Sequence, residues 1–186
     1  KANHMLIAPK RQYHITTNSH NRFRKHKNLI ADVIPSQPEQ IWVSDITYID
    51  AGQGFEYLHL VTDAYSKQIM GYQLSATMSA SETAQALQMA INNRKYPLAP
   101  LVHHSDRGLQ YCSKLYTDIL KDNNIGISMT EQSDPYENAV AERVNGILKY
   151  EFLLLEGLRT HLETVEAIKS SIYIYNNDRP HMSCNL

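Results

Sequence analysis

Cysteines and long apolar runs are scarce in this sequence, and each scarcity excludes a class of protein. Only two cysteines, Cys112 and Cys184, occur among the 186 residues, and they form no CxxC pair. Two isolated cysteines exclude a disulfide scaffold and are too few for a structural zinc site. No window approaches 18 consecutive apolar residues, and the N-terminus lacks the apolar segment of a secretory signal. We therefore expect a reduced, cytoplasmic chain that does not span a membrane.

Acidic residues are absent from the first 30 residues, which contain seven Lys and Arg residues. The rest of the chain has 11 basic against 19 acidic residues, so the net charge of −1 hides a basic arm on an acidic body. Such an arm favours a polyanionic partner, and Tyr13 and Phe23 within it favour nucleic acid, because aromatic rings stack on bases. The alternative is a solvated tail. A polar stretch with two prolines, at 35–40, predicts an arm and linker over 1–37 and one domain over 38–186.

The order of apolar segments after this boundary predicts a mixed α/β domain. We expect strands at 41–49, 55–66, 67–75, 101–105 and 125–130. We expect helices at 82–94, 113–124, 139–156 and 162–178. The first three strands have tight connections and therefore predict an antiparallel meander, whereas the later strands alternate with helices. This order predicts a ribonuclease-H-like fold, with a mixed five-stranded sheet flanked by helices.

Three carboxylates stand where a purely structural sequence seldom places them. Asp45 lies inside the apolar strand at 41–49, and burying a carboxylate there is costly unless it is paired or bound to a metal. Asp106 ends the strand in "LVHHS", and Glu142 lies near the start of a helix. The alternatives are a satisfied buried Asp45, an ordinary turn at Asp106 and a solvated helix face around Glu142.

Convergence of three carboxylates on one point would suit a hard divalent cation. Mg²⁺ (or Mn²⁺) takes oxygen ligands, keeps several waters and shares its coordination with substrate phosphates. Two such ions, about 3.5–4 Å apart, activate the attacking oxygen and stabilise the leaving oxygen of a phosphodiester. The three residues together therefore predict a metal site for phosphodiester chemistry.

The helix that contains Glu142 also has a polar strip. At about 100° per residue, Glu142, Asn145 and Lys149 share one face of this helix. Val144 and Ile147 lie roughly opposite and form a better core stripe. The strip therefore contains candidate contacts for a nucleic-acid substrate beside the expected metal site.

Four motifs follow one another along the chain: "WVSDITYI", "HHSDRGLQYCS", "ENAVAERVNGILKYE" and "YNNDRPH". Together they resemble the catalytic core of insertion-sequence transposases of the IS-three type, in the retroviral-integrase superfamily. The 35 residues between Asp106 and Glu142 reproduce the D,D-35-E spacing of that superfamily. The resemblance covers about residues 28–181 and implies that Asp45, Asp106 and Glu142 are the catalytic, metal-binding triad.

The resemblance also implies DNA contacts along the same helix. Lys149 matches a lysine that lies along the path of the DNA end in integrases, and Asn145 shares its face. Arg143 stands where serine is frequent, and it could contact a phosphate or pair with Glu137 or Glu151. The role of the C-terminal "YNNDRPH" signature is open, although Asn, Arg and His at a helix end can tie down the chain.

The implied function is that of a transposase, which cleaves DNA at the ends of an insertion sequence and transfers the strands by transesterification. The resemblance implies Mg²⁺ (or Mn²⁺) as cofactor, with two ions when DNA is bound. It implies transposon ends and target DNA as partners, a homo-oligomer on DNA, and a bacterial, cytoplasmic location associated with the nucleoid. It also implies an upstream helix-turn-helix region, and the lack of an initial Met predicts that this chain is a fragment.

Three other functions stay open at this point. The first is a nuclease of the same fold that only hydrolyses nucleic acid, and the second is a non-catalytic DNA-binding or assembly module. The third is a transition-metal site at His103 and His104, which is disfavoured because adjacent strand residues point to opposite faces.

Overall fold

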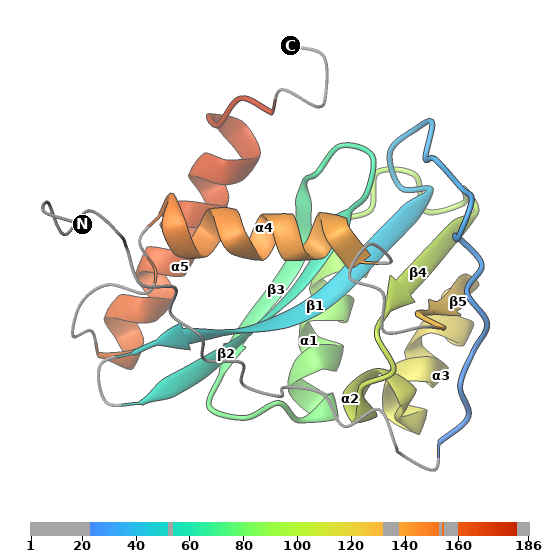
Figure 1. Ribbon diagram of the computed structural model, residues 1–186, viewed down its shortest axis with the longest axis horizontal. Helices are drawn as coiled ribbons and strands as arrows, with labels where there is room; N and C mark the ends of the chain where they lie inside the picture. The colour runs from blue at the N-terminus through green and yellow to red at the C-terminus, as the bar shows by residue number, and fades with distance from the viewer. Residues whose placement is uncertain (1–22, 52–53, 132–137, 153, 155–159, 182–186) are drawn as a thin grey trace, which may run out of the picture.

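A five-stranded sheet with helices on both faces makes up the described part of the chain, which covers residues 23–51, 54–131, 138–152, 154 and 160–181 of the computed structural model (Figure 1). The strands are β1 (Ile41–Asp50), β2 (Phe55–Asp63), β3 (Ile69–Ser75), β4 (Leu101–Ser105) and β5 (Ile125–Met129). The helices are α1 (Ala80–Asn92), α2 (Leu109–Cys112), α3 (Lys114–Asp122), α4 (Ala139–Tyr150) and α5 (His161–Asn177). No helix among these residues is long and apolar enough to cross a membrane.

The sheet has the strand order β3-β2-β1-β4-β5. Strands β1, β2 and β3 pair in antiparallel fashion, and β4 lies parallel to both β1 and β5. The predicted meander and the predicted mixed five-stranded sheet are therefore both confirmed. The strand expected at 55–66 ends at Asp63, because its Oδ1 accepts hydrogen bonds from the amides of Tyr65 and Ser66 and turns the chain.

Two helical segments differ from the prediction. The short helix α2 was not expected, since four residues are too few to show a helical period. Helix α4 was expected to continue to residue 156 but ends at Tyr150. The chain leaves the helix here and buries Leu154 in the cluster of α4 and α5 side chains, at 1% exposure. Residues 153, 155 and 156 of the expected helix lie outside the described part.

Strand β1 alternates its side chains between two cores. Trp42 and Ile46 point into the core shared with α1, α2 and α3. Ile41, Val43 and Ile49 lie in clusters that contain side chains of α4. Because side chains alternate along a strand, Asp45 is directed to the same face as α4, in the middle of β1.

The C-terminal signature "YNNDRPH" fastens α5 to the sheet. The side-chain amide of Asn176 accepts from the Ile69 amide at 2.9 Å and donates to the Ile69 carbonyl at 3.0 Å. Arg179 binds both carboxylate oxygens of Glu151 at 2.8 and 2.9 Å, which connects the end of α5 to the end of α4. These contacts are structural, so the part of the signature that they involve serves to hold the two C-terminal helices in place.

The last part of the basic arm is bound to β5, the strand at the edge of the sheet opposite β3. Residues 27–30, which we name the strap, run beside β5, where Figure 1 shows the chain in blue. The Leu29 amide donates to Ser128 Oγ at 2.8 Å, and the Met129 amide donates to the Lys27 carbonyl at 3.3 Å. This part of the arm is therefore not a solvated tail, while residues 1–22, including Tyr13, lie outside the described part.

Candidate active site

The first two predicted carboxylates are neighbours on adjacent parallel strands. The register between β1 and β4 pairs Trp42 with His103 and Val43 with His104. Continued by two residues, this register places Asp45 beside Asp106, on strands that lie about 4.8 Å apart. The two carboxylates also repel each other, since the charge of Asp106 raises the pKa of Asp45. The parallel β1–β4 pair thus brings together residues that are far apart in the sequence.

Asp45 is held by two hydrogen bonds at the middle of β1. Its Oδ1 accepts from the Ile46 amide at 2.9 Å, and its Oδ2 accepts from the side-chain amide of Asn145 at 2.7 Å. Burial is the largest influence on this group, followed by the charge of Asp106, and together they raise the pKa of Asp45 to about 7. A carboxylate in this position is therefore costly to ionise unless a positive charge is nearby.

Asp106 is fixed by the turn that follows β4. Its Oδ1 accepts from the Gly108 amide at 2.8 Å. A Cβ on Gly108 would lie 2.9 Å from that same oxygen and 2.6 Å from the side-chain nitrogen of Gln110, so these two side chains would have to shift to make room for it. Helix α2 begins at Leu109, directly after Gly108. The turn therefore orients Asp106, whose side chain is half-buried.

Glu142 lies in the first turn of α4, where its side chain is exposed. The start of this helix is anchored to β1, because the side-chain amide of Asn138 donates to the Ser44 carbonyl at 3.2 Å. Glu142 is close enough to contribute to the raised pKa of Asp45. Within the described ranges, however, no three Asp, Glu, His or Cys side chains already form a group that could hold a metal ion.

Asn145 has a position that sequence reasoning did not anticipate. It was predicted to contact DNA, but its side chain is buried at 7% exposure, and its amide donates to Asp45. Its Oδ1 has no hydrogen-bond partner among the described residues. The sequence did place Asn145 on the same helix face as Glu142, and this was the signal that could have indicated its position. In the structure Asn145 on that face contacts Asp45 of β1.

Lys149 lies over the ring of Tyr48, with Nζ 3.8 Å from the ring centroid. Burial lowers the pKa of Lys149, and the negative charge of Asp45 acts in the opposite direction. The cation–π contact fixes the lysine beside the carboxylates rather than in bulk solvent. Tyr48, three residues after Asp45 on β1, was not recognised as part of the site from the sequence.

Arg143 is exposed on α4 next to Glu142. One of the two expected ion-pair partners, Glu151, binds Arg179 instead. The other, Glu137, lies outside the described residues. A phosphate contact by Arg143 stays a prediction.

The adjacent histidines of β4 point to opposite faces, as expected. His103 Nε2 is within hydrogen-bond distance of Ser44 Oγ at 2.7 Å and of Tyr116 OH at 2.9 Å. His104 Nδ1 is 2.8 Å from Ser128 Oγ on the other face. Burial lowers the pKa of His103 to about 3, so this ring is neutral. His104 has no exposed surface.

The donor atoms of the site fit a hard divalent cation. Asp45 and Asp106 present oxygens from neighbouring strands, and their mutual repulsion raises the pKa of Asp45, which a cation between them would offset. The buried Oδ1 of Asn145 is one more oxygen beside Asp45 without a partner among the described residues. Glu142 could complete the set from α4.

Comparisons with known proteins agree with this geometry. The integrase core domain family matches residues 35–135 and, in a second description, residues 123–186. The chain is 36% identical over 174 residues to the insertion element IS600 uncharacterized 31 kDa protein of Shigella sonnei, covering 92% of this chain and 64% of that protein. It is 34% identical over 146 residues to the transposase for insertion sequence element IS629 of Shigella sonnei, covering 78% of this chain and 49% of that protein.

A solved structure has the same fold. The HTLV-2 integrase catalytic core domain, solved in complex with magnesium in a dimeric form, superposes with a TM-score of 0.62 at 23% identity, covering 77% of this chain and 90% of that one. This likeness confirms the expected ribonuclease-H-like fold class. The chain spans about half to two thirds of the length of the two curated relatives (49% and 64%). On the match over more than half of its length, the chain belongs to the integrase core domain family.

Proposed function

We propose that this chain is the catalytic core of an insertion-sequence transposase, which cleaves DNA at the ends of the element and transfers the strands by transesterification. The observation that carries the proposal is the β1–β4 register, because its continuation by two residues would bring Asp45 next to Asp106, whose charge raises the pKa of Asp45. Glu142 on α4 follows Asp106 at the integrase spacing of 35 residues. The likeness to a protein named as the transposase for IS629 supports the same function.

Asp45, Asp106 and Glu142 are the residues that would hold Mg²⁺ (or Mn²⁺), with two ions when DNA is bound. The HTLV-2 integrase core was solved in complex with magnesium, which supports this choice of cation. When bound, such ions polarise a phosphoryl oxygen and lower the pKa of the attacking hydroxyl. The chain's own part is to keep three carboxylates at fixed positions against their mutual repulsion.

The neighbouring residues orient these carboxylates and the substrate. The Ile46 amide and the Asn145 side-chain amide bind one oxygen each of Asp45, and the Gly108 amide binds Oδ1 of Asp106, so both carboxylates are held in a fixed orientation. Lys149 presents a positive charge beside Asp45, where a phosphate of the DNA end would lie. Arg143, exposed next to Glu142, could contact a phosphate further along the strand.

Partners and organisation follow from the same proposal. Transposon ends and target DNA are the substrates, and a homo-oligomer forms on DNA, which the dimeric form of the HTLV-2 core supports. Residues 1–37 form the basic arm and linker, and residues 38–186 form the core. An upstream helix-turn-helix region of the longer protein would recognise the ends. The site of action is the bacterial cytoplasm, with nucleoid association when DNA is bound.

Strand joining separates transposition from the two other functions. The purified chain is mixed with duplex oligonucleotides that carry the end sequence of the encoding element and a free 3′-OH, together with a supercoiled plasmid. We expect oligonucleotide–plasmid products in Mg²⁺ and none in EDTA, because the joining step needs the three carboxylates to bind a cation. Products are counted by the label on the oligonucleotide after gel separation.

The two alternatives give different results in this assay. Cleaved plasmid without joined product would favour a nuclease that only hydrolyses. Plasmid that is retarded in the gel but neither cleaved nor joined would favour a non-catalytic DNA-binding module. A reaction that proceeds equally in EDTA would contradict a metal-dependent site at the carboxylates.

Replacing Lys149 with Met is expected to lower strand joining about 10- to 100-fold with little change in stability. Methionine keeps an apolar stem on the Tyr48 ring but removes the charge beside Asp45. The slope of log affinity for DNA against log salt should fall by about 1, the value for one phosphate contact. Lys169→Met, an exposed change on α5, is the control. An unchanged joining rate together with an unchanged salt slope would remove Lys149 from the DNA path.

A further inference from the structure

We propose that Arg24, Lys25 and Lys27, together with Arg107, form a binding track for the phosphate backbone of duplex DNA, and that this track leads to Asp106. The inference rests on the proposed function, because it extends the path of the DNA beyond the carboxylates. It assigns a ligand to the part of the basic arm that lies next to the sheet. This part of the arm is not included in the candidate active site described above.

The strap fixes the position of these charges relative to the sheet. Its backbone is bound to Ser128, Met129 and Glu131, the last by a 3.0 Å bond from the Asn28 amide. Ser128 is fully buried and also lies 2.8 Å from His104, so the strap is connected to β4 as well as to β5. Lys27 is therefore part of an anchored segment, and Lys25 and Arg24 lie two and three residues before it.

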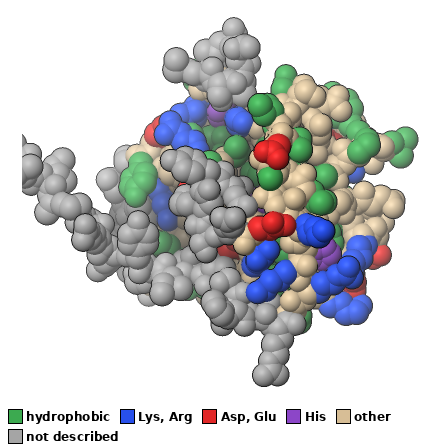
Figure 2. All heavy atoms as spheres, turned by 45° about the vertical axis from the view of Figure 1, so that its right-hand side comes forward, with side chains coloured by type: hydrophobic (Ala, Val, Ile, Leu, Met, Phe, Trp, Pro, Cys, Tyr) green, Lys and Arg blue, Asp and Glu red, His purple; other side chains and the backbone are tan. Residues whose placement is uncertain are grey.

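The side chains of Arg24, Lys25 and Lys27 are exposed, and none of the three forms a salt bridge with a described residue. Positive charges converge near His26, since after the effect of burial both Arg24 and Lys121 contribute to lowering the pKa of His26. Figure 2 shows several Lys and Arg side chains gathered on this face of the molecule. Concentrated positive charge on a body that is otherwise acidic favours a polyanion at this place.

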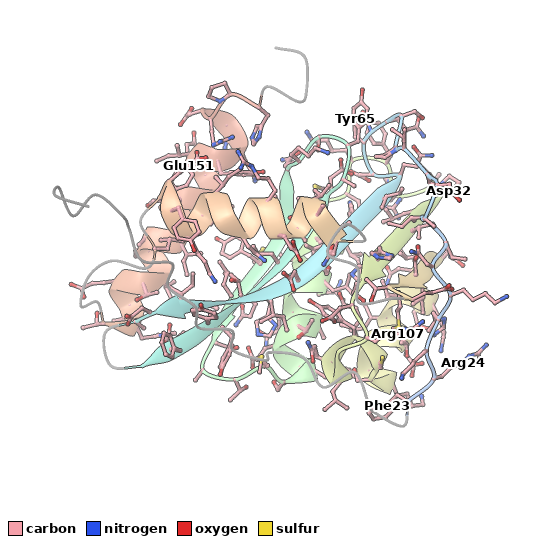
Figure 3. The ribbon with its side chains drawn as sticks, viewed as in Figure 1. Phe23, Arg24, Asp32, Tyr65, Arg107 and Glu151 are labelled. Carbon is pink, nitrogen blue, oxygen red and sulfur yellow. The ribbon has the colours of Figure 1, made fainter. Side chains whose placement is uncertain are left out.

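Glu131 connects this charge to the active site. Its side chain accepts from the Asn28 amide of the strap, and its carbonyl accepts from Arg107 Nη1 at 3.2 Å. Arg107 directly follows Asp106, so the same residue touches the strap and the residue next to the candidate metal ligand. Figure 3 shows Arg24 and Arg107 on the same side of the molecule.

The dimensions of the track suit a DNA backbone. Arg24 and Lys27 are three positions apart, so their Cα atoms span at most about 10 Å. Successive phosphates of one strand are about 3.4 Å apart along the duplex axis, so these three side chains can reach several of them. The chemistry is the same for element-end DNA and for target DNA, and the two are separated by the test.

The test begins with DNA binding in EDTA, where no strand is cut or joined. Arg24, Lys25 and Lys27 are changed to Gln together, which removes three charges and leaves the backbone bonds of the strap intact. We expect the slope of log affinity against log salt, measured by fluorescence anisotropy with a labelled duplex, to fall by about 2 to 3. The matched control changes Lys95, Lys114 and Lys169 to Gln, three exposed residues outside the track, and should leave the slope within about 0.5 of that of the unmodified chain.

The DNA-binding measurement does not depend on catalysis, because it is made in EDTA. Its result therefore tests the track even if strand joining is never observed and the proposed function fails. An equal fall of the slope in both triple variants, or no fall in either, would overturn the track. Where joining is observed, the KM for end oligonucleotide and for target plasmid are measured separately. A rise of about tenfold in only one KM would assign the track to that DNA, and unchanged values of both would also overturn it.

Discussion

Strand transfer is expected to fall at least about a thousandfold when Asp45 is replaced by Asn, and to fall as far with Asp106→Asn or Glu142→Gln. Each change replaces a carboxylate with a neutral amide. The site then has one negative charge fewer with which to bind a divalent cation next to the phosphodiester. A loss of about 4 kcal/mol of transition-state stabilisation corresponds to a factor of a thousand in rate, and metal ions supply several kcal/mol of such stabilisation. The time course of oligonucleotide–plasmid joining in Mg²⁺ measures the loss.

The three variants are informative only if they fold. Asp122→Asn, an exposed change on α3, serves as the matched control, and it should join DNA at the rate of the unmodified chain. Denaturant unfolding of all four variants shows whether lost activity comes from the site or from the fold. Full strand transfer by any one of the three carboxylate variants would remove that residue from the triad.

Asp45→Asn should also make the metal-free chain more stable at pH 8, even though it abolishes activity. In the folded chain the pKa of Asp45 is raised to about 7, against a reference value of 3.8. Below pH 3.8 the carboxyl is protonated in both the folded and unfolded states, so its contribution is fully favourable there. As pH rises through about 7 that contribution is lost, and the cost reaches at most about 4 kcal/mol.

An asparagine at position 45 carries no charge and avoids this loss. The amide of Asn145 can also turn over, so that its Oδ1, which has no partner among the residues that the structure describes, accepts from the new side chain. Guanidinium unfolding at pH 5 and pH 8 in EDTA should therefore show a decline for the unmodified chain and a smaller one for Asp45→Asn. Adding Mg²⁺ at pH 8 should stabilise the unmodified chain but not the variant. Equal pH profiles in EDTA would contradict the raised pKa.

The position of Asp45 could be predicted because strand periodicity is a local property. The apolar residues of "IWVSDITYI" alternate between two cores, and this alternation placed the carboxylate inside the fold. The parallel neighbour Asp106 could also be predicted, since the apolar strand before it has the length and composition of a buried strand. Both conclusions depend on a few consecutive residues.

The surroundings of these carboxylates could not be predicted, because they depend on how α4 is rotated against β1. The helical period gave Asn145 and Lys149 a common face, but that face could equally have met solvent or DNA. Packing of Val144 and Leu148 into the core turns it toward Asp45 and Tyr48 instead. The strap was missed for a similar reason, since its bonds to Ser128 and Glu131 join residues about 100 positions apart.

Both outer strands of the sheet already have occupants, and this limits how copies of the chain can meet. On β3, the side-chain amide of Asn176 satisfies the amide and carbonyl of Ile69 as a neighbouring strand would. On β5, the Met129 amide is engaged by Lys27. A second copy therefore cannot extend the sheet at these residues without displacing α5 or the strap.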